Sequence, residues 1–481
     1  MRFRAGLLMV LAGCLTACQP PPGESPEKAR NVILFVGDGM GVATVTAARI
    51  FDGQSKGLAG EEHMLPFETF PNVALVKTYN TNQQTPDSAG TITAMLTGVK
   101  TRAGMLNVGP EALRESCEGQ FAHPLTPIAV PLHDAGKAIG IVTTTRVTHA
   151  TPAGVYARTA ERDWEDDSDI APADWERGCR DVAWQLVQAE NGPQIVLGGG
   201  SQHFFGANRF GERRDADADL VRDWLAGSAS RRYITSAAQL DDLQAGQQVL
   251  GLFASEHMTF MAEKASDSTE PTLTQMATTA VRLLEEGDAG YFLLIEGGRI
   301  DHGHHDAKPG FAMLETQEFA NAVAGVLKMI DLEETLVLVT ADHSHVFTMG
   351  GYATRGNPIL GHVVKNDDQG LPKDGPDIAA DGQPYTTLSY ANGPGFVREL
   401  PRPEPETGID AFAQSLVPVF YENEDGTHEY SETHGGEDVA LYAIGPGSEA
   451  ARGVIEQDRI YDIMIGALGL AAENQSPFVL H

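Results

Sequence analysis

Six short apolar runs constrain the fold of this 481-residue chain more than any other feature of its sequence. Each run is continuous, as is typical of a strand that is buried on both faces of a sheet. Helical patterns lie between the runs, including residues 272–286 and 311–329. The alternation predicts an α/β fold with a largely parallel sheet. The predicted strands are residues 31–36, 138–144, 194–197, 291–295, 335–340 and 439–444.

Acidic and imidazole side chains follow three of these predicted strands. Asp38 follows the first strand, Glu296 follows the fourth, and Asp342 and His343 follow the fifth. In parallel sheets, binding sites form beyond the carboxyl ends of the strands, so we expect these side chains to share one site.

Further side chains of the same kinds lie close to these strand ends. Asp301 and His305 are four residues apart and would share one face of a helical turn, and His434 precedes the last predicted strand. Imidazole mixed with carboxylate suits zinc. A set of oxygen ligands, such as Thr151 with two of the carboxylates above, suits magnesium. The sequence therefore predicts a metal centre.

Residues 85–91 place a serine at the expected start of a helix. Asp87 is a good N-cap, residues 88–96 are small or apolar, and Gly98 is typical of a helix end. Unpaired N–H groups at a helix N-terminus favour a phosphate or an alkoxide, so Ser88 is a candidate nucleophile. The alternative is a serine that only begins a helix. The sequence lacks the Gly-x-Ser-x-Gly motif, which argues against an ordinary serine hydrolase.

Together these motifs resemble those of alkaline phosphatases, in the family's order, from about residue 31 to residue 469. The resemblance is closer to the animal type than to the enterobacterial type around His149 and residues 302–305. It implies a three-layer αβα sandwich with a large, mostly parallel central sheet, and a catalytic domain over residues 31–481. The motifs are VGDGMG at 36–41, DSAGT at 87–91, TTTR at 143–146, EGGRIDHGHH at 296–305, TADHSH at 340–345 and HGGED at 434–438.

The resemblance also implies two zinc ions and one magnesium ion. The implied ligands are Asp301, His305 and His434 for the first zinc ion; Asp38, Asp342, His343 and the Ser88 oxygen for the second; and Asp38, Thr151 and Glu296 for magnesium.

Other side chains take roles from the same resemblance. Arg162 matches the arginine that binds phosphate, since a guanidinium can bind two oxygens at once. Arg158, the nearby alternative, is expected to be solvated. His149 is expected beside the magnesium ion, without binding it directly. Three more histidines are expected to support the site from outside the ligand sets: His302, His304 and His345.

The implied function is hydrolysis of phosphate monoesters through a phosphoserine intermediate at Ser88. Phosphodiesterases and sulfatases resemble the same superfamily but differ in the nucleophile and in the group that replaces magnesium. The magnesium ligands and Arg162 favour monoesters. A non-enzymatic alternative, a lipoprotein that binds phosphate or metal, is less consistent with a serine that binds zinc.

Residues 356–432 are rich in Gly, Pro, Asp and Asn, and we expect them to form an insertion at the position of the family's crown. Animal-type enzymes also have a calcium-type site that uses a glutamate after a phenylalanine. Here Ala254 follows Phe253, so no calcium ion is expected, although Glu270 remains near the family's acidic position. A homodimer is expected from the family alone.

The N-terminus resembles a bacterial lipoprotein signal. Residues 1–17 contain a short basic region and an apolar stretch that is too short to span a bilayer. Cys18 is the preferred lipidation site, with Cys14 as the alternative, and residues 19–30 would form a flexible tether. The protein is therefore expected to be exported to the periplasm or cell surface and held to the membrane by lipid.

The expected export predicts a disulfide, and the strongly negative net charge limits the possible partners. In an oxidising compartment Cys117 and Cys179 can form a disulfide, and their placement matches a pair in animal-type alkaline phosphatases. The net charge is −32, which argues against nucleic acid or an anionic membrane surface as a partner. Local cations must overcome this charge if the substrate is an anion.

Overall fold

The computed structural model describes residues 28–189, 192–399, 402–422 and 428–471. The predicted signal peptide, both candidate lipidation sites and most of the predicted tether lie outside those ranges. The last residues of the predicted tether, however, are part of the described structure. Ala29 is buried, and its N–H donates to the carbonyl of Ala467 at 2.9 Å, while the Arg30 N–H donates to the carbonyl of Glu334 at 2.7 Å. The folded domain therefore includes Ala29 and Arg30, and the predicted tether ends before them.

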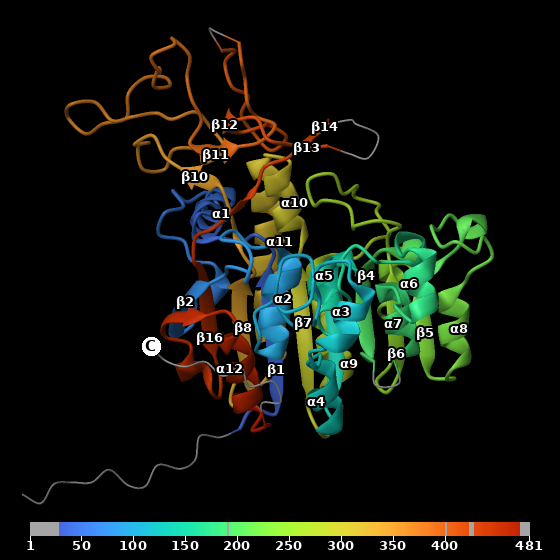
Figure 1. Cartoon of the computed structure of the whole chain (residues 1–481). Coiled ribbons are helices and arrows are strands. Elements are labelled where there is room, and N and C mark those ends of the chain that lie inside the picture. The colour runs from blue at the N-terminus through green and yellow to red at the C-terminus, as the bar shows by residue number, and fades with distance from the viewer. Residues whose placement is uncertain (1–27, 190–191, 400–401, 423–427, 472–481) are drawn as a thin grey trace, which may run out of the picture.

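A sheet of ten strands lies at the centre of the described structure (Figure 1). Strand β16 is antiparallel to both of its neighbours, and the other pairings in this sheet are parallel. The predicted parallel sheet is confirmed. In spatial order the strands are β17 (Gly453–Glu456), β2 (Asn72–Lys77), β16 (Val439–Ile444), β8 (Thr335–Ala341), β1 (Asn31–Gly37), β7 (Tyr291–Gly297), β3 (Ala138–Arg146), β4 (Ile195–Gly199), β6 (Gln248–Leu252) and β5 (Arg231–Ile234).

The middle strands are buried on both faces, which explains their continuous apolar sequences. Each residue of β1, β7 and β8 is buried. All six predicted strands form, and most extend by one or two residues beyond the predicted limits. The sequence did not predict β2, β5, β6 or β17.

Helices cover both faces of the sheet, which gives the expected three layers (Figure 1). Helix α11 contacts α1 and α9 on one side, and α2 contacts α5 and α12 on the other. Across the described ranges, no helix combines the length and the apolar character that crossing a bilayer requires. The helices are α1 (Val42–Ser55), α2 (Ser88–Thr97), α3 (Cys117–Ala122), α4 (Ala129–Asp134), α5 (Ala150–Ala153), α6 (Pro172–Arg177), α7 (Val182–Gln188), α8 (Leu220–Ala226), α9 (Leu273–Leu284), α10 (Arg299–His305), α11 (Pro309–Leu327) and α12 (Arg459–Ala467).

Short strands form an upper tier above one end of the central sheet (Figure 1). This tier includes most of the residues that we expect to be an insertion. Its strands are β10 (Phe347–Met349), β11 (Leu388–Asn392), β12 (Gln414–Val417), β13 (Phe420–Glu422) and β14 (His428–Tyr430). Two further short strands, β9 (Ser344–His345) and β15 (His434–Gly435), pair with each other, and β15 carries a predicted metal ligand.

The structure contains the expected disulfide between Cys117 and Cys179. The bond packs in a small apolar cluster with Trp164 and Ile170. Trp164 lies two residues after Arg162, so this cluster anchors the loop that carries the predicted phosphate-binding side chain.

Candidate functional site

The carboxyl ends of neighbouring strands bring the first predicted ligands together. Strand β1 lies between β7 and β8, and Val36 is in register with Glu296. Asp38 therefore follows the strand end beside Glu296. The chain then turns at Gly39 with φ 66°, where a Cβ atom would lie 2.3 Å from Nε2 of His345. Only glycine fits this turn.

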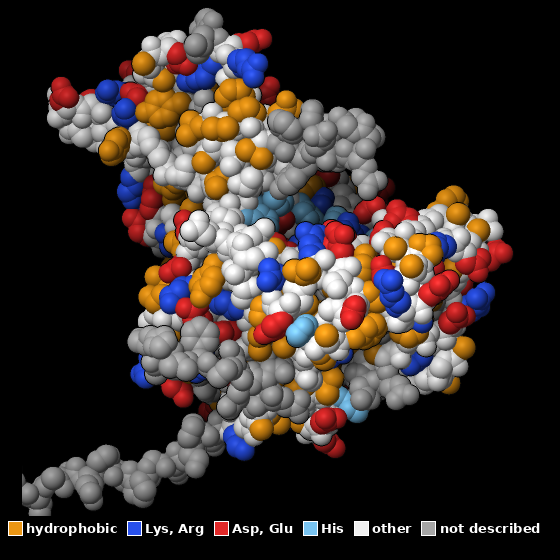
Figure 2. Space-filling model, viewed as in Figure 1, with side chains coloured by type: hydrophobic (Ala, Val, Ile, Leu, Met, Phe, Trp, Pro, Cys, Tyr) orange, Lys and Arg blue, Asp and Glu red, His pale blue; other side chains and the backbone are white. Residues whose placement is uncertain are grey.

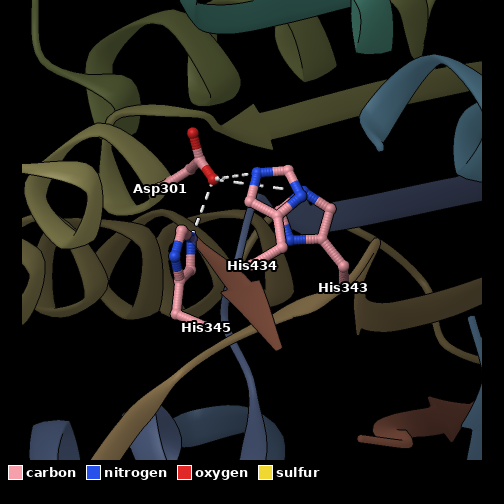
Figure 3. Close-up of side chains that lie close together, drawn as sticks. All are labelled: Asp301, His343, His345 and His434. Carbon is pink, nitrogen blue, oxygen red and sulfur yellow. Dashed lines mark hydrogen bonds and ion pairs between the residues drawn. The ribbon is translucent and has the colours of Figure 1, made fainter. Parts of the chain in front are cut away.

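The residues predicted for the first zinc ion converge. Nε2 of His305 lies 3.4 Å from Oδ2 of Asp301 and 3.1 Å from Nε2 of His434. Nε2 of His434 lies 3.5 Å from Oδ1 of Asp301. Figure 3 shows that His343 and His345 also point toward this carboxylate. Helix α10 supplies Asp301 and His305, whereas His434 comes from β15, far away in the sequence.

The residues predicted for the second zinc ion form an adjoining group. Nε2 of His343 lies 3.4 Å from Oδ1 of Asp38 and 3.2 Å from Oδ2 of Asp342. The Ser88 hydroxyl lies 3.2 Å from the same nitrogen. Ser88 is the first residue of α2, and Asp87 caps this helix by accepting backbone N–H groups, as predicted. A buried hydroxyl thus lies at a helix N-terminus beside three potential metal ligands.

A third group lies on the other side of Asp38. Ligand atoms of Asp38, His149 and Glu296 all lie within 4.8 Å of one another, so His149 is close enough to bind an ion directly. Several polar atoms here are buried and lack a hydrogen-bond partner within the described structure. They are both carboxylate oxygens of Asp38, Oε1 of Glu296, the Thr151 hydroxyl and Nδ1 of His149. Unsatisfied buried polar atoms are costly, and a bound cation would satisfy such oxygens.

Negative charge accumulates among these groups. Burial, followed by the charges of Asp342 and Asp301, raises the pKa of Asp38 well above its usual value. Burial raises the pKa of Glu296 to about 7, and Asp342 contributes to the shift. A cation between such carboxylates would remove their mutual repulsion and restore their charged forms. The donor set therefore fits metal ions.

Burial favours the neutral, metal-coordinating form of three imidazoles in the site. Burial lowers the pKa of His149, His345 and His434 well below the usual value for histidine. A neutral ring keeps the lone pair that coordination requires. Burial acts to raise the pKa of Asp301, but His305, His345 and His434 together hold it well below the usual value. Asp301 is therefore a carboxylate with imidazoles around it.

Glu432 is a site residue that the sequence did not reveal. Nε2 of His345 lies 2.8 Å from Oδ1 of Asp301, and Nδ1 of the same ring lies 2.5 Å from Oε2 of Glu432. The ring of His345 thus lies between Asp301 and Glu432 and contacts both carboxylates. One signal was present in the sequence. Glu432 is two residues before His434, and residues two apart on an extended chain face the same side.

Arg162 lies at the edge of the site, whereas Arg158 is engaged elsewhere. Nη2 of Arg162 donates to Nε2 of His149 at 2.8 Å, and Nη1 lies 3.5 Å from Oδ2 of Asp87. The expectation that Arg158 is solvated was wrong. Its side chain is partly buried, and Nε and Nη2 donate to the carbonyl of Leu125 at 3.2 Å and 2.8 Å.

Two other residues have structural contacts outside the ligand sets. His304 lies 3.0 Å from the Thr44 hydroxyl and 2.7 Å from the Tyr390 hydroxyl, so it joins α1 and α10 to the upper tier. Glu270 accepts hydrogen bonds from the backbone and hydroxyl of Thr259, both at 2.9 Å.

Histidine side chains are visible within a hollow below the upper tier, with charged side chains of both signs at its rim (Figure 2). The site is therefore open to a solute. It combines a hydroxyl, an arginine and three groups of metal-type ligands, which suits the capture and transfer of a charged oxyanion.

Known proteins resemble this chain over most of its length. Residues 29–470 match the family model described as alkaline phosphatase. The tissue-nonspecific isozyme of alkaline phosphatase from Gallus gallus is 42% identical over 454 residues, which cover 90% of this chain and 83% of that protein. Alkaline phosphatase from Gadus morhua is 40% identical over 454 residues, which cover 90% of both. The structure of Thermus thermophilus alkaline phosphatase, 24% identical, matches 92% of both chains with a TM-score of 0.65 and supports the fold.

Proposed function

The chain belongs to the alkaline phosphatase family and is a phosphomonoesterase, and we propose that it acts through a phosphoserine intermediate at Ser88. The observation that carries the proposal is the position of the Ser88 hydroxyl, 3.2 Å from Nε2 of His343 and at the start of α2. The alternative, a serine that only begins a helix, does not account for its contact with the metal-type ligand His343.

Two zinc ions and one magnesium ion are the proposed cofactors. Asp301, His305 and His434 would hold one zinc ion, and the group around His343 with Ser88 would hold the other. Thr151, Glu296 and Asp38 would hold magnesium, with His149 beside it. When bound, such ions lower the pKa of a coordinated hydroxyl and neutralise charge that develops on a phosphoryl group.

In the proposed reaction Ser88 is the nucleophile and Arg162 binds the phosphate group. The Ser88 oxygen forms a bond to phosphorus as the bond to the alcohol oxygen breaks, and the departing oxygen then takes up a proton. Water later cleaves the phosphoserine, which releases phosphate and restores the hydroxyl. Arg162 can hold two phosphate oxygens through its planar guanidinium. Its present contacts with His149 and Asp87 keep it at the edge of the site.

A comparison of three nitrophenyl esters tests the reaction class. We expect zinc- and magnesium-loaded protein to hydrolyse nitrophenyl phosphate far faster than bis-nitrophenyl phosphate or nitrophenyl sulfate, because Arg162 and the proposed ligands suit a monoester dianion. Removal of the metals with a chelator should abolish the activity, and zinc with magnesium should restore it. Faster turnover of the diester or the sulfate would favour those alternatives, and no turnover of any ester would favour a binding lipoprotein.

Lipid attachment at Cys18 and dimer formation complete the proposal. One acyl chain binds a membrane weakly, whereas several chains anchor a protein firmly. We expect the exported protein to partition into detergent in a bacterial host, and Cys18→Ser to remain in the aqueous phase. Equal partitioning of the parent and the Cys18→Ser variant into detergent would show that Cys18 is not the lipid-anchored residue.

Sedimentation velocity on the protein without its signal peptide would test the expected homodimer.

A further inference from the structure

Arg114 is an ionic partner of both residues that flank Arg162 in the sequence. Its guanidinium contacts both carboxylate oxygens of Glu161, with Nε at Oε2 and Nη2 2.7 Å from Oε1. Nη2 also lies 3.3 Å from Oδ2 of Asp163. A bidentate pair between a guanidinium and a carboxylate restricts the orientation of both side chains. Arg114 therefore holds the chain on both sides of the predicted phosphate-binding arginine.

Backbone hydrogen bonds join the segment that carries Arg114 to the segment that carries Arg162. The Arg162 N–H donates to the carbonyl of Gly104 at 2.8 Å, and the Glu115 N–H donates to the carbonyl of Ala160 at 3.0 Å. The two segments therefore lie side by side, and the ion pairs of Arg114 connect them directly.

Glu161 depends on Arg114 for the balance of its charge. The Glu161 side chain is only 6% exposed, and Arg114 is its one ion-pair partner within the described ranges. An unpaired buried carboxylate is costly, so this side chain would move toward water or another cation if Arg114 were removed. Either movement would displace the backbone of Arg162, which is the next residue.

Asp163 competes with phosphate for the guanidinium of Arg162. Its Oδ1 lies 3.8 Å from Nε of Arg162, and its side chain is 70% exposed, so it is free to turn toward either arginine. Its other oxygen, Oδ2, contacts Arg114. Because Arg114 holds this carboxylate, it limits the attraction between Asp163 and Arg162 and leaves the guanidinium of Arg162 open to another anion.

We propose that Arg114 is a positioning residue, which keeps the guanidinium of Arg162 available to bind two phosphate oxygens. It does so through the carboxylates of Glu161 and Asp163, without contacting phosphate itself. The inference rests on the proposed function, because Arg162 is the phosphate-binding residue of that proposal. The effect of Arg114 should therefore appear in the affinity for phosphate groups and disappear when Arg162 is absent.

The test measures the affinity of the zinc- and magnesium-loaded enzyme for inorganic phosphate, by calorimetry and by inhibition of nitrophenyl phosphate hydrolysis. Arg114→Gln should weaken phosphate binding and raise KM for nitrophenyl phosphate by about tenfold, as expected for lost hydrogen bonds to charged groups, whereas kcat should change less. Arg114→Lys keeps the charge without the planar fork and should lose less affinity than Arg114→Gln. Arg102→Gln removes a nearby, partly buried arginine, whose Nε donates to the Pro110 carbonyl at 2.7 Å, and should leave the affinity unchanged.

A double-mutant cycle shows whether Arg114 acts through Arg162. In the Arg162→Ala background, Arg114→Gln should change the affinity for phosphate by less than about twofold. An equal loss of affinity in both backgrounds would overturn the proposal, because Arg114 would then act without Arg162. Zinc and magnesium contents are measured on each variant, and a loss of metal that accounts for the weaker binding in Arg114→Gln would overturn it as well.

The outcomes also separate this inference from the proposed function. Unchanged phosphate affinity in Arg114→Gln, in an enzyme whose affinity falls on Arg162→Ala, would reject only the positioning role. Unchanged affinity in Arg162→Ala would reject both the phosphate-binding role of Arg162 and the inference built on it. Absence of all esterase activity in the loaded parent would reject the proposed function, and calorimetry with phosphate would still test Arg114.

Discussion

Ser88→Ala should lower kcat/KM for nitrophenyl phosphate by at least about 10³-fold, as expected for loss of a nucleophile. The physical reason is the environment of the hydroxyl: it is buried, lies at the N-terminus of α2 and is 3.2 Å from Nε2 of His343. Acid quenching with labelled phosphate, followed by peptide mapping, should find label on the parent's Ser88 peptide and none in the variant.

A hydroxyl on the same helix provides the matched control. Thr93 donates to the Met105 carbonyl and accepts from the Asn107 N–H, so its side chain is engaged away from the metal-type ligands. Thr93→Val should retain the label at Ser88, even if it lowers stability by about 1 kcal/mol through the lost hydrogen bonds. Absence of label at every pH tested, with full activity in Ser88→Ala, would mean that water attacks the ester directly.

The pH of the reaction buffer before the acid quench should change the amount of labelled enzyme. Hydrolysis of phosphoserine consumes a deprotonated water, which becomes scarcer as the pH falls. Provided that the metals stay bound, labelled enzyme should therefore be more abundant in mildly acidic buffer than in alkaline buffer. The opposite trend would place the slow step before the phosphoenzyme.

The strands that the sequence predicted and those that it did not differ in burial. Strand β1 is buried along its whole length, so its apolar residues form one continuous run. Strand β2 lies one position from the edge of the sheet, and Val73 and Leu75 remain 47% and 42% exposed. Its apolar run covers only residues 73–76 between Asn72 and Lys77, which is too short to stand out as a strand in the sequence. Strand β5 is at the other edge and begins with two arginines, which no strand pattern would predict.

The site was predictable where ligands follow parallel strands. Asp38, Glu296 and Asp342 are such cases, because parallel strands bring their carboxyl ends to one edge of the sheet. Arg162 needed the family resemblance, since nothing local distinguishes it from Arg158. Contacts between distant segments, such as that between the rings of His257 and His302, required the structure itself.

Asp301→Ala should cost far more activity than His149→Ala. Asp301 is the carboxylate that three imidazoles share: His305 and His434 lie at 3.4 Å and 3.5 Å, and His345 lies at 2.8 Å. Its removal would leave His305 and His434 without their carboxylate partner and would take one proposed ligand from the first zinc ion. His149 is expected to act beside the magnesium ion, where losses of about 10–100-fold are typical. We expect the loss at Asp301 to be at least about tenfold larger than that.

Metal analysis separates this effect from general destabilisation. Asp301→Ala and the isosteric Asp301→Asn should both bind less zinc than the parent after dialysis against a fixed zinc concentration, whereas His149→Ala should keep its zinc and lose magnesium. Asp306→Ala removes an exposed carboxylate just after the same helix and should leave both metals and the activity close to those of the parent. An equal loss of activity at Asp301 and His149, or a larger one at His149, would contradict the assignment. The charge of Asp301 would then serve the packing of the imidazoles, and the ion nearest the leaving group would need other ligands.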